Sequence, residues 1–257
     1  MSGNSTISIP VDVRNPGQFF ACCGLLELAW RAGNDAIGSC GCFGRGTFEL
    51  QGDASMLIGT LRHLVDAEPI VEENREPLGV LRLPGLQLRL DWWREPGRRK
   101  DPWDKTPFKL WAGQQTSASI YSTLRTTVAS ALTACDVPLN RPFALRAPLT
   151  SRFGFDPGAA WNALDAGFSP NDQDYGVSSS PVVELLAAVG IQRFRPIPVN
   201  DDQDAFEYVA WSQPLPACVA VAVAAACVPD SSSRRFRFRI ASRGSYGCFT
   251  TATEITR

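Results

Sequence analysis

The chain opens with the pattern of a strand, a tight corner and a helix. Isoleucine or valine occupies every second position over residues 7–13, which is the period of a strand with one solvent-facing side. Residues 19–30 are then apolar on nearly every side, so we expect a buried helix there. Asn15 can cap this helix, and Pro16 suits its first position, where a missing N–H costs nothing.

Apolar residues recur at helical spacing in three further segments and alternate in several short ones. We expect helices over residues 55–65, 121–135 and 181–190, the last of them ending at Gly190. We expect strands over residues 47–50, 81–83, 86–90, 207–211, 217–228 and 235–240, and loops over residues 66–77 and 91–111. Because strands and helices do not alternate regularly, the pattern predicts an α+β fold with a mixed antiparallel sheet and packed helices. We assign residues 1–257 to one such domain, with a candidate subdivision near residues 137–150.

The proline-rich segment 91–111 combines positive charge with tryptophan. Cations can neutralise phosphates and aromatic faces can stack on unpaired bases, so we expect a loop that contacts nucleic acid. Two adjacent amides follow it, and glutamine can hydrogen-bond adenine edges. The candidate contacts are Arg98, Arg99, Lys100, Lys105, Lys109, Gln114 and Gln115. The alternative is a solvated loop whose tryptophans anchor it to the body of the protein.

A second candidate is the run of alternating arginine and apolar residues over 234–240. As a strand it places its arginines on one face and its phenylalanines on the other. Like charges along one face need a negative partner, which is either nucleic-acid phosphate or an acidic protein surface such as the chain's own residues 201–204. A shorter repeat of the theme follows the helix at 181–190. The candidate contacts here are Arg193, Arg195, Arg234, Arg235, Arg237, Arg239 and Arg243.

The composition changes this picture in two ways. The chain has 257 residues and a formal net charge of -1, which excludes a globally basic nucleic-acid binder but leaves local basic patches. The opening lacks the pattern of an export signal, and we find no run typical of a membrane span, so we expect a cytoplasmic protein without membrane contact. The eight cysteines are then expected to be reduced thiols.

Signals for metal binding and catalysis are sparse. Cys40 and Cys42 form a close pair, but no second pair accompanies them, and zinc sites usually need four ligands. The sequence contains neither a phosphate-binding glycine loop nor a nucleophile elbow. His63, the single histidine, is the one candidate for acid–base chemistry, as in a metal-independent ribonuclease. We therefore expect no cofactor, no metal and no enzymatic activity.

Two segments resemble a known protein family. The first is residues 11–29, VDVRNPGQFFACCGLLELA, and the second runs from FGFD at 153–156 through ALDAGFSPN at 163–171 to PVVELLAAVGIQRFRP at 181–196. Together they look like the short large-subunit (Cas8-type) proteins of subtype I-U, also called I-G, CRISPR loci. The likeness covers between a quarter and a third of the chain and includes no catalytic signature.

The resemblance implies a subunit of a Cascade surveillance complex. Such a complex carries a guide CRISPR RNA, and the large subunit sits near the 5′ end of the guide beside backbone and 5′-cap subunits. It contacts the protospacer-adjacent motif of target double-stranded DNA and helps to open the R-loop, while a recruited helicase-nuclease performs the cleavage. The chain is half the size of larger members or less, which leaves open whether it has their C-terminal helical bundle.

Three hypotheses follow. The leading one is a non-catalytic, nucleic-acid-binding subunit of a CRISPR effector in antiviral defence. The second is a CRISPR RNA-processing endoribonuclease that uses His63. The third is a purely architectural subunit whose arginines meet acidic protein surfaces.

Overall fold

The computed structural model describes residues 5–32, 39–73, 78–94, 105–138, 140–158, 177–228, 232–243 and 246–255. The helices are α1 (Pro16–Ala32), α2 (Ala54–Asp66), α3 (Ser117–Thr133), α5 (Pro181–Arg193) and α6 (Ala217–Ala224), with short 3-10 turns η1 (Pro84–Leu86) and η2 (Pro142–Ala144). The strands are β1 (Thr6–Pro10), β2 (Cys40–Phe43), β3 (Thr47–Gln51), β4 (Ile70–Glu73), β5 (Val80–Leu83), β6 (Leu88–Leu90), β7 (Ala147–Leu149), β8 (Val177–Ser179), β9 (Ile197–Val199), β10 (Asp202–Ala210), β11 (Leu215–Pro216), β12 (Arg234–Arg243), β13 (Tyr246–Phe249) and β14 (Thr253–Ile255). Helices packed on antiparallel sheets confirm the α+β class.

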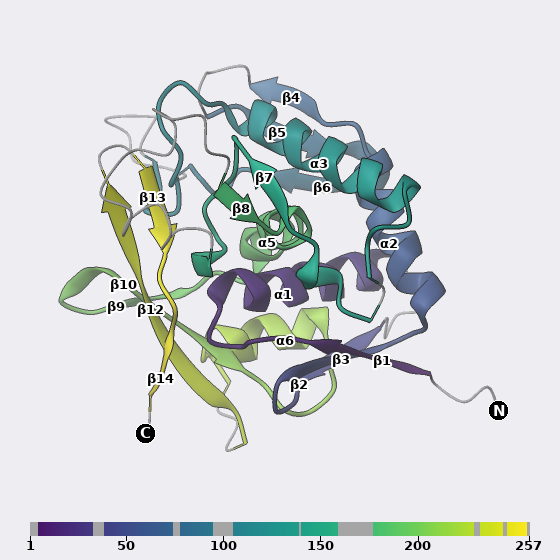
Figure 1. Ribbon diagram of the computed structural model, residues 1–257. Helices are drawn as coiled ribbons and strands as arrows, with labels where there is room; N and C mark the ends of the chain where they lie inside the picture. The colour runs from purple at the N-terminus through teal and green to yellow at the C-terminus, as the bar shows by residue number, and fades with distance from the viewer. Residues whose placement is uncertain are drawn as a thin grey trace.

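The strands form separate antiparallel sheets around two central helices. One sheet has the order β1-β3-β2-β11, and a second has the order β13-β12-β10-β9 with β14 beside β12. Strands β4, β5 and β6 form a third sheet, and β7 pairs with β8. Figure 1 shows α1 and α5 at the centre, with the β12 sheet along one side and the β4–β6 sheet above, next to α3.

The helix predicted from the opening residues is confirmed. Helix α1 begins at Pro16, and the Asn15 side-chain oxygen accepts the N–H of Gln18, as an N-cap does. Nearly all of its residues up to Ala29 are buried, Glu27 included. The helix is therefore a core element, not a surface element.

Helices α1 and α5 cross with their backbones in contact. A Cβ atom added at Gly24 of α1 would lie 2.0 Å from the carbonyl oxygen of Leu186, and one added at Gly190 of α5 would lie 1.9 Å from that of Phe20. Real Cβ atoms do not approach oxygen so closely, so only glycine fits at both positions. The crossing also explains why Gly190 does not end the helix, which continues to Arg193.

A buried carboxylate at the start of α5 holds the segment 153–156. Glu184 has no solvent exposure. One of its oxygens accepts the N–H groups of Phe153 and Gly154, each at 3.0 Å. The other accepts those of Phe155 at 3.0 Å and Asp156 at 3.1 Å. Burial raises the pKa of Glu184 to about 7, while the N–H bonds and the charge of Arg152 act to lower it.

The same segment is bonded to the start of α1. Asn15 donates its amide N–H to a carboxylate oxygen of Asp156 at 2.9 Å, and Arg146 donates to the other oxygen at 2.7 Å. A Cβ atom at Gly17 would lie 2.5 Å from the carbonyl oxygen of Phe155, so α1 meets the segment closely here too. Residues 153–156 therefore connect the first turns of both central helices.

The tryptophans of the predicted 91–111 loop lie in the core. Trp92, Trp93 and Trp111 are at most 2% exposed and pack edge-on or tilted against one another and against Phe153 and Phe155, apart from the parallel rings of Trp93 and Phe153. The backbone on the two sides of residues 95–104 is bonded together. Arg94 and Lys105 form an isolated antiparallel β-bridge, and Thr106 donates its N–H to the Trp93 carbonyl. These three tryptophans therefore anchor the segment to the body of the protein, as in the alternative given for this loop. Residues 95–104 lie outside the described part of the chain.

Two expected elements differ from the structure. The strand expected at 217–228 is instead helix α6, whose alanine-rich sequence favours a helix and buries Ala217, Ala220, Val223 and Ala224 at helical spacing. Strand β4 lies within the expected loop 66–77. None of the helices in the described ranges is both long and apolar enough to cross a membrane.

Replacing Gly24 by alanine tests the helix crossing. The added methyl group would collide with the Leu186 carbonyl, so the helices would have to separate. We expect G24A to lower the free energy of unfolding by about 3 kcal/mol or more, measured by urea denaturation. The matched control is G59A on α2, where an added Cβ meets nothing within 4 Å. Alanine is favoured over glycine in a helix by about 0.5–1 kcal/mol, so G59A should be at least as stable as the wild type. Equal stabilities of G24A and G59A would contradict the crossing.

Replacing Glu184 by glutamine tests the carboxylate and its ring of donors. The new amide N–H₂ would face backbone N–H groups, which cannot accept a hydrogen bond. We expect E184Q to lose about 2–4 kcal/mol of unfolding free energy, because buried N–H groups that now bond to a carboxylate oxygen would be left without an acceptor. E254Q, at an exposed position of β14, is the control. A loss for E184Q no larger than for E254Q would rule out the proposed role.

Candidate nucleic-acid interface

The arginine strand forms as the sequence predicts. In β12, Phe236 and Phe238 are buried against the core, and Arg235, Arg237 and Arg239 point to the other face. Exposure of these arginine side chains rises along the strand from 32% through 46% to 57%. The face is thus accessible, most of all at Arg239.

Each of these arginines already has an acidic partner on β10. Glu207 lies opposite Arg237 in the strand register and is only 4% exposed. Its two oxygens accept bonds from Arg235 at 2.5 Å and from Arg237 at 2.8 Å. Arg239 pairs with Asp202, one of the acidic residues at 201–204 named as an internal partner. Arg235 and Arg237 share the carboxylate of Glu207, and Arg239 has that of Asp202. The three arginines therefore outnumber their two acidic partners, which leaves an excess of positive charge on this face.

Arg193, the last residue of α5, and Arg195, just beyond the helix, are also engaged within the protein. Arg193 pairs with the buried Glu27 of α1 at 2.7 Å and lies over the ring of Trp30. Arg195 donates to the carbonyl oxygen of Trp92 at 3.0 Å, and burial lowers its pKa while the charge of Asp91 raises it. Both side chains therefore tie α5 to its neighbours.

The candidate residues of the 91–111 segment differ in their exposure and in their contacts. Lys105 is exposed. Lys109 donates to the Trp111 carbonyl and lies 5.0 Å from the centre of its ring, and burial together with the nearby charge of Lys105 lowers the Lys109 pKa. Arg98, Arg99 and Lys100 lie outside the described residues, as does the side chain of Arg243.

The two glutamines also differ in their exposure and in their hydrogen bonds. Gln114 is exposed. Gln115 donates to the carbonyl of Thr150 and the hydroxyl of Ser151, each at 3.1 Å. Gln115 therefore holds a loop in place, which leaves Gln114 as the accessible amide of the pair.

The structure adds Arg45, which sequence reasoning missed. It is an exposed residue in the turn between β2 and β3, flanked by Gly44 and Gly46. Arg234, the first residue of β12, donates to the Gly44 carbonyl at 3.1 Å and lies over the ring of Phe236. The sequence signal for this residue is a single arginine between two glycines, which is typical of the exposed tip of a turn.

Other sites for chemistry receive little support. His63 is exposed on α2. The described residues contain no group of three or more histidine, cysteine, aspartate or glutamate side chains placed to hold a metal ion. Burial raises the pKa values of Cys40 and Cys42, which disfavours the thiolate form that metals bind.

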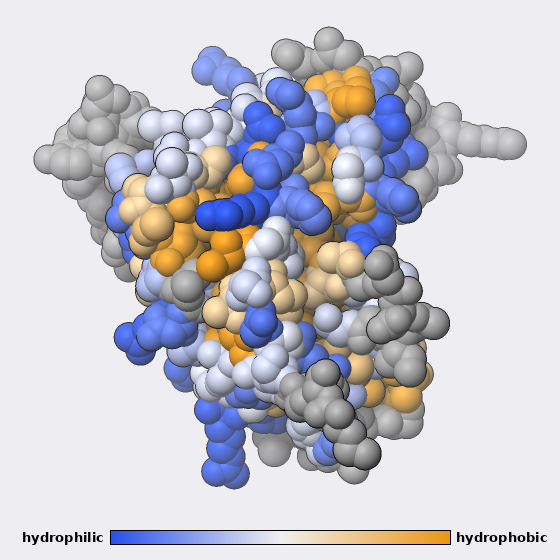
Figure 2. Space-filling view, turned by 90° about the vertical axis from the view of Figure 1, so that its right-hand side faces the viewer, coloured by the Kyte–Doolittle hydropathy of each residue, from blue (hydrophilic) through white to orange (hydrophobic). Residues whose placement is uncertain are grey.

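The face shown in Figure 2 has small apolar patches separated by hydrophilic side chains.

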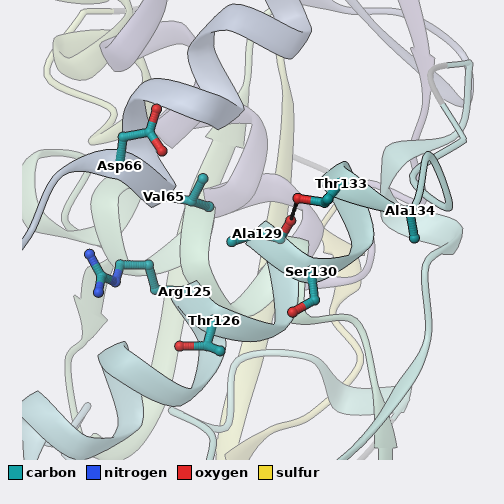
Figure 3. Close-up of a pocket in the computed structure, with 8 residues that line it drawn as sticks. All are labelled: Val65, Asp66, Arg125, Thr126, Ala129, Ser130, Thr133 and Ala134. Carbon is teal, nitrogen blue, oxygen red and sulfur yellow. Dashed lines mark hydrogen bonds between the residues drawn. The ribbon is translucent and has the colours of Figure 1, made fainter.

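A cavity of about 670 Å³ lies between α2 and α3. Figure 3 shows Asp66 and Arg125 toward one end of it and the hydroxyls of Ser130 and Thr133 toward the other. Arg125 lies 3.8 Å from Glu68, and Thr133 donates back to the Ala129 carbonyl of its own helix. The cavity is open and none of its groups converge on one point, so it supports no specific ligand.

Comparison with known proteins adds nothing to this geometry, because no family model, no curated protein and no solved structure matches the chain.

Charge reversal should separate a structural arginine from an accessible one. R237E would bring a second carboxylate against the buried Glu207, so we expect it to cost about 3 kcal/mol of unfolding free energy. R239E disturbs a pair in which both partners are partly exposed, so its cost should be about 0–1 kcal/mol. Urea denaturation of both variants measures the difference, and equal costs would show that Glu207 is not held by Arg237.

Proposed function

We propose that this protein is a non-catalytic subunit of a type I CRISPR surveillance complex in the cytoplasm. In that complex it contacts the 5′ region of the guide CRISPR RNA and target double-stranded DNA. Its role there is recognition of the protospacer-adjacent motif and initiation of the R-loop. Backbone and 5′-cap subunits lie beside it, and a recruited helicase-nuclease performs the cleavage.

The observation that supports this proposal best is the contact between the two family-like segments. Residues 11–29 contribute α1, and the described parts of residues 153–196 contribute the Glu184-bound loop and α5. They meet at the glycine crossing and through the bond from Asn15 to Asp156. The resemblance therefore falls on residues that build one structural unit, as expected of segments that define a fold.

The surface charge is compatible with phosphate contact. The chain as a whole is close to neutral, so its arginines act locally. On β12 two arginines share one carboxylate, and their guanidinium groups stay partly exposed. Guanidinium groups bind phosphate in the same forked geometry as carboxylate.

Omission of the subunit tests the proposal. The effector is purified with and without this chain, and its affinity for target duplexes with correct and altered motifs is measured. We expect omission to weaken binding at least about tenfold and to remove the preference between motifs. Unchanged affinity with an unchanged motif preference would refute the proposal. Recovery of guide RNA in both preparations is the control for assembly.

A purely architectural role is the second candidate, because Glu207, Asp202 and Glu27 pair with the predicted arginines. The two roles differ in salt dependence. Phosphate contacts release counterions, so nucleic-acid affinity falls steeply as salt rises. An architectural subunit would leave the salt slope of target binding unchanged when it is omitted.

A further inference from the structure

We infer that nucleic acid contacts this protein at the junction of its two larger sheets, through Arg45 and Arg234, and that this contact is to the sugar–phosphate backbone. The inference rests on the proposed function and names its contact surface. We call this pair of residues the junction arginines.

The junction is defined by bonds between the two sheets. Arg234 donates to the carbonyl of Gly44, which precedes Arg45 in the β2–β3 turn. The N–H of Phe43 bonds to the carbonyl of Trp211, the residue directly after β10, and the indole N–H of Trp211 bonds to the Gly41 carbonyl at 2.7 Å. Figure 1 shows the lower end of β12 beside the β2–β3 hairpin. The turn therefore lies next to the first residue of the arginine strand.

The turn presents Arg45 to solvent by its backbone geometry. Gly46 has a φ of 83°, in the left-handed region that glycine adopts without strain. A Cβ atom at Gly44 would lie 2.7 Å from the Thr47 hydroxyl. Glycines on both sides leave Arg45 as the one side chain at the tip.

The junction arginines differ in charge balance from Arg235, Arg237 and Arg239 of β12. Within the described part of the chain, no carboxylate lies within 4 Å of the guanidinium of Arg45 or Arg234. Glu254, which lies opposite Phe236 in the β12–β14 register, forms no ion pair with Arg234 among these residues. In contrast, a phosphate that displaced the buried Glu207 from Arg235 or Arg237 would leave this carboxylate without its partner. Leaving such a carboxylate unpaired is strongly unfavourable.

The contact is to the backbone because the aromatic rings that build the junction are buried. Phe43 and Trp211 are at most 3% exposed, and the ring of Phe236 under Arg234 has no solvent exposure. Exposed arginines without stacking rings neutralise phosphates and fix position, whereas base edges and stacked bases carry sequence information. Arg234, held by the Gly44 carbonyl and the Phe236 ring, is already ordered for this contact.

The experiment measures binding of the purified full chain to a short DNA of mixed sequence, as a single strand and as a duplex, by fluorescence anisotropy over a series of salt concentrations. We expect R45E to weaken binding several-fold on any sequence, and to reduce the salt slope for the duplex by about 0.9 for each phosphate that the protein no longer neutralises. R234Q should act in the same direction. The matched control is R62E, a charge reversal at an exposed position of α2, which should leave binding within about twofold of the wild type.

The outcomes are distinct. If the wild type binds DNA but R45E and R234Q bind as tightly as R62E, the contact lies elsewhere and the inference fails, while the proposed function stands on the omission experiment. If the isolated chain binds neither DNA, the inference also fails. Weaker binding on only one sequence would show base readout instead of backbone contact. Unchanged thermal unfolding of R45E, at an exposed turn tip, confirms that any weakening of binding does not come from unfolding.

Discussion

The carboxylate of Glu184 is the interaction on which the rest of the structure depends. Among the described residues no cationic side chain is bonded to it, and its charge is balanced by the N–H groups of four consecutive residues, 153–156. A loop that donates all these groups to one side chain has only one conformation available. Burial of a charged group is costly, and each N–H bond to it recovers part of that cost. The arrangement therefore fixes a segment that contains no helix or strand of its own.

The fixed segment organises its surroundings in three directions. Its aromatic rings, Phe153 and Phe155, pack against the tryptophans that hold both ends of the 91–111 segment. Its Asp156 bonds to the cap of α1, and α1 in turn meets α5 at the glycine crossing. The Gly154 carbonyl accepts the N–H of Phe249 in β13, which belongs to the sheet of the arginine strand. The arginine face is thus positioned by a chain of contacts that begins at Glu184.

The sequence predicted the elements with strong local signals and missed what depends on distant partners. Helix α1 follows from its cap, its proline and its apolar run. Gly190 resembles a helix end, but its role in the crossing depends on α1, which is more than 150 residues away in the sequence. The alternation of β12 was readable, yet its main counter-ion, Glu207, is set by strand register and does not show in local sequence. The position of Arg45 beside Arg234 likewise does not show in the local sequence, because only the fold brings this turn next to β12.

Hydrogen exchange of the backbone amides of residues 153–156 tests the central claim most directly. In most proteins, amides of such a segment outside helices and strands exchange through local opening. Here they are bonded to a buried carboxylate, so we expect Phe153, Gly154, Phe155 and Asp156 to exchange only with global unfolding. Their exchange free energies should then equal those of the buried amides of α1 and α5. Exchange of these four amides at the rate of exposed loops, while α1 and α5 remain protected, would contradict the account.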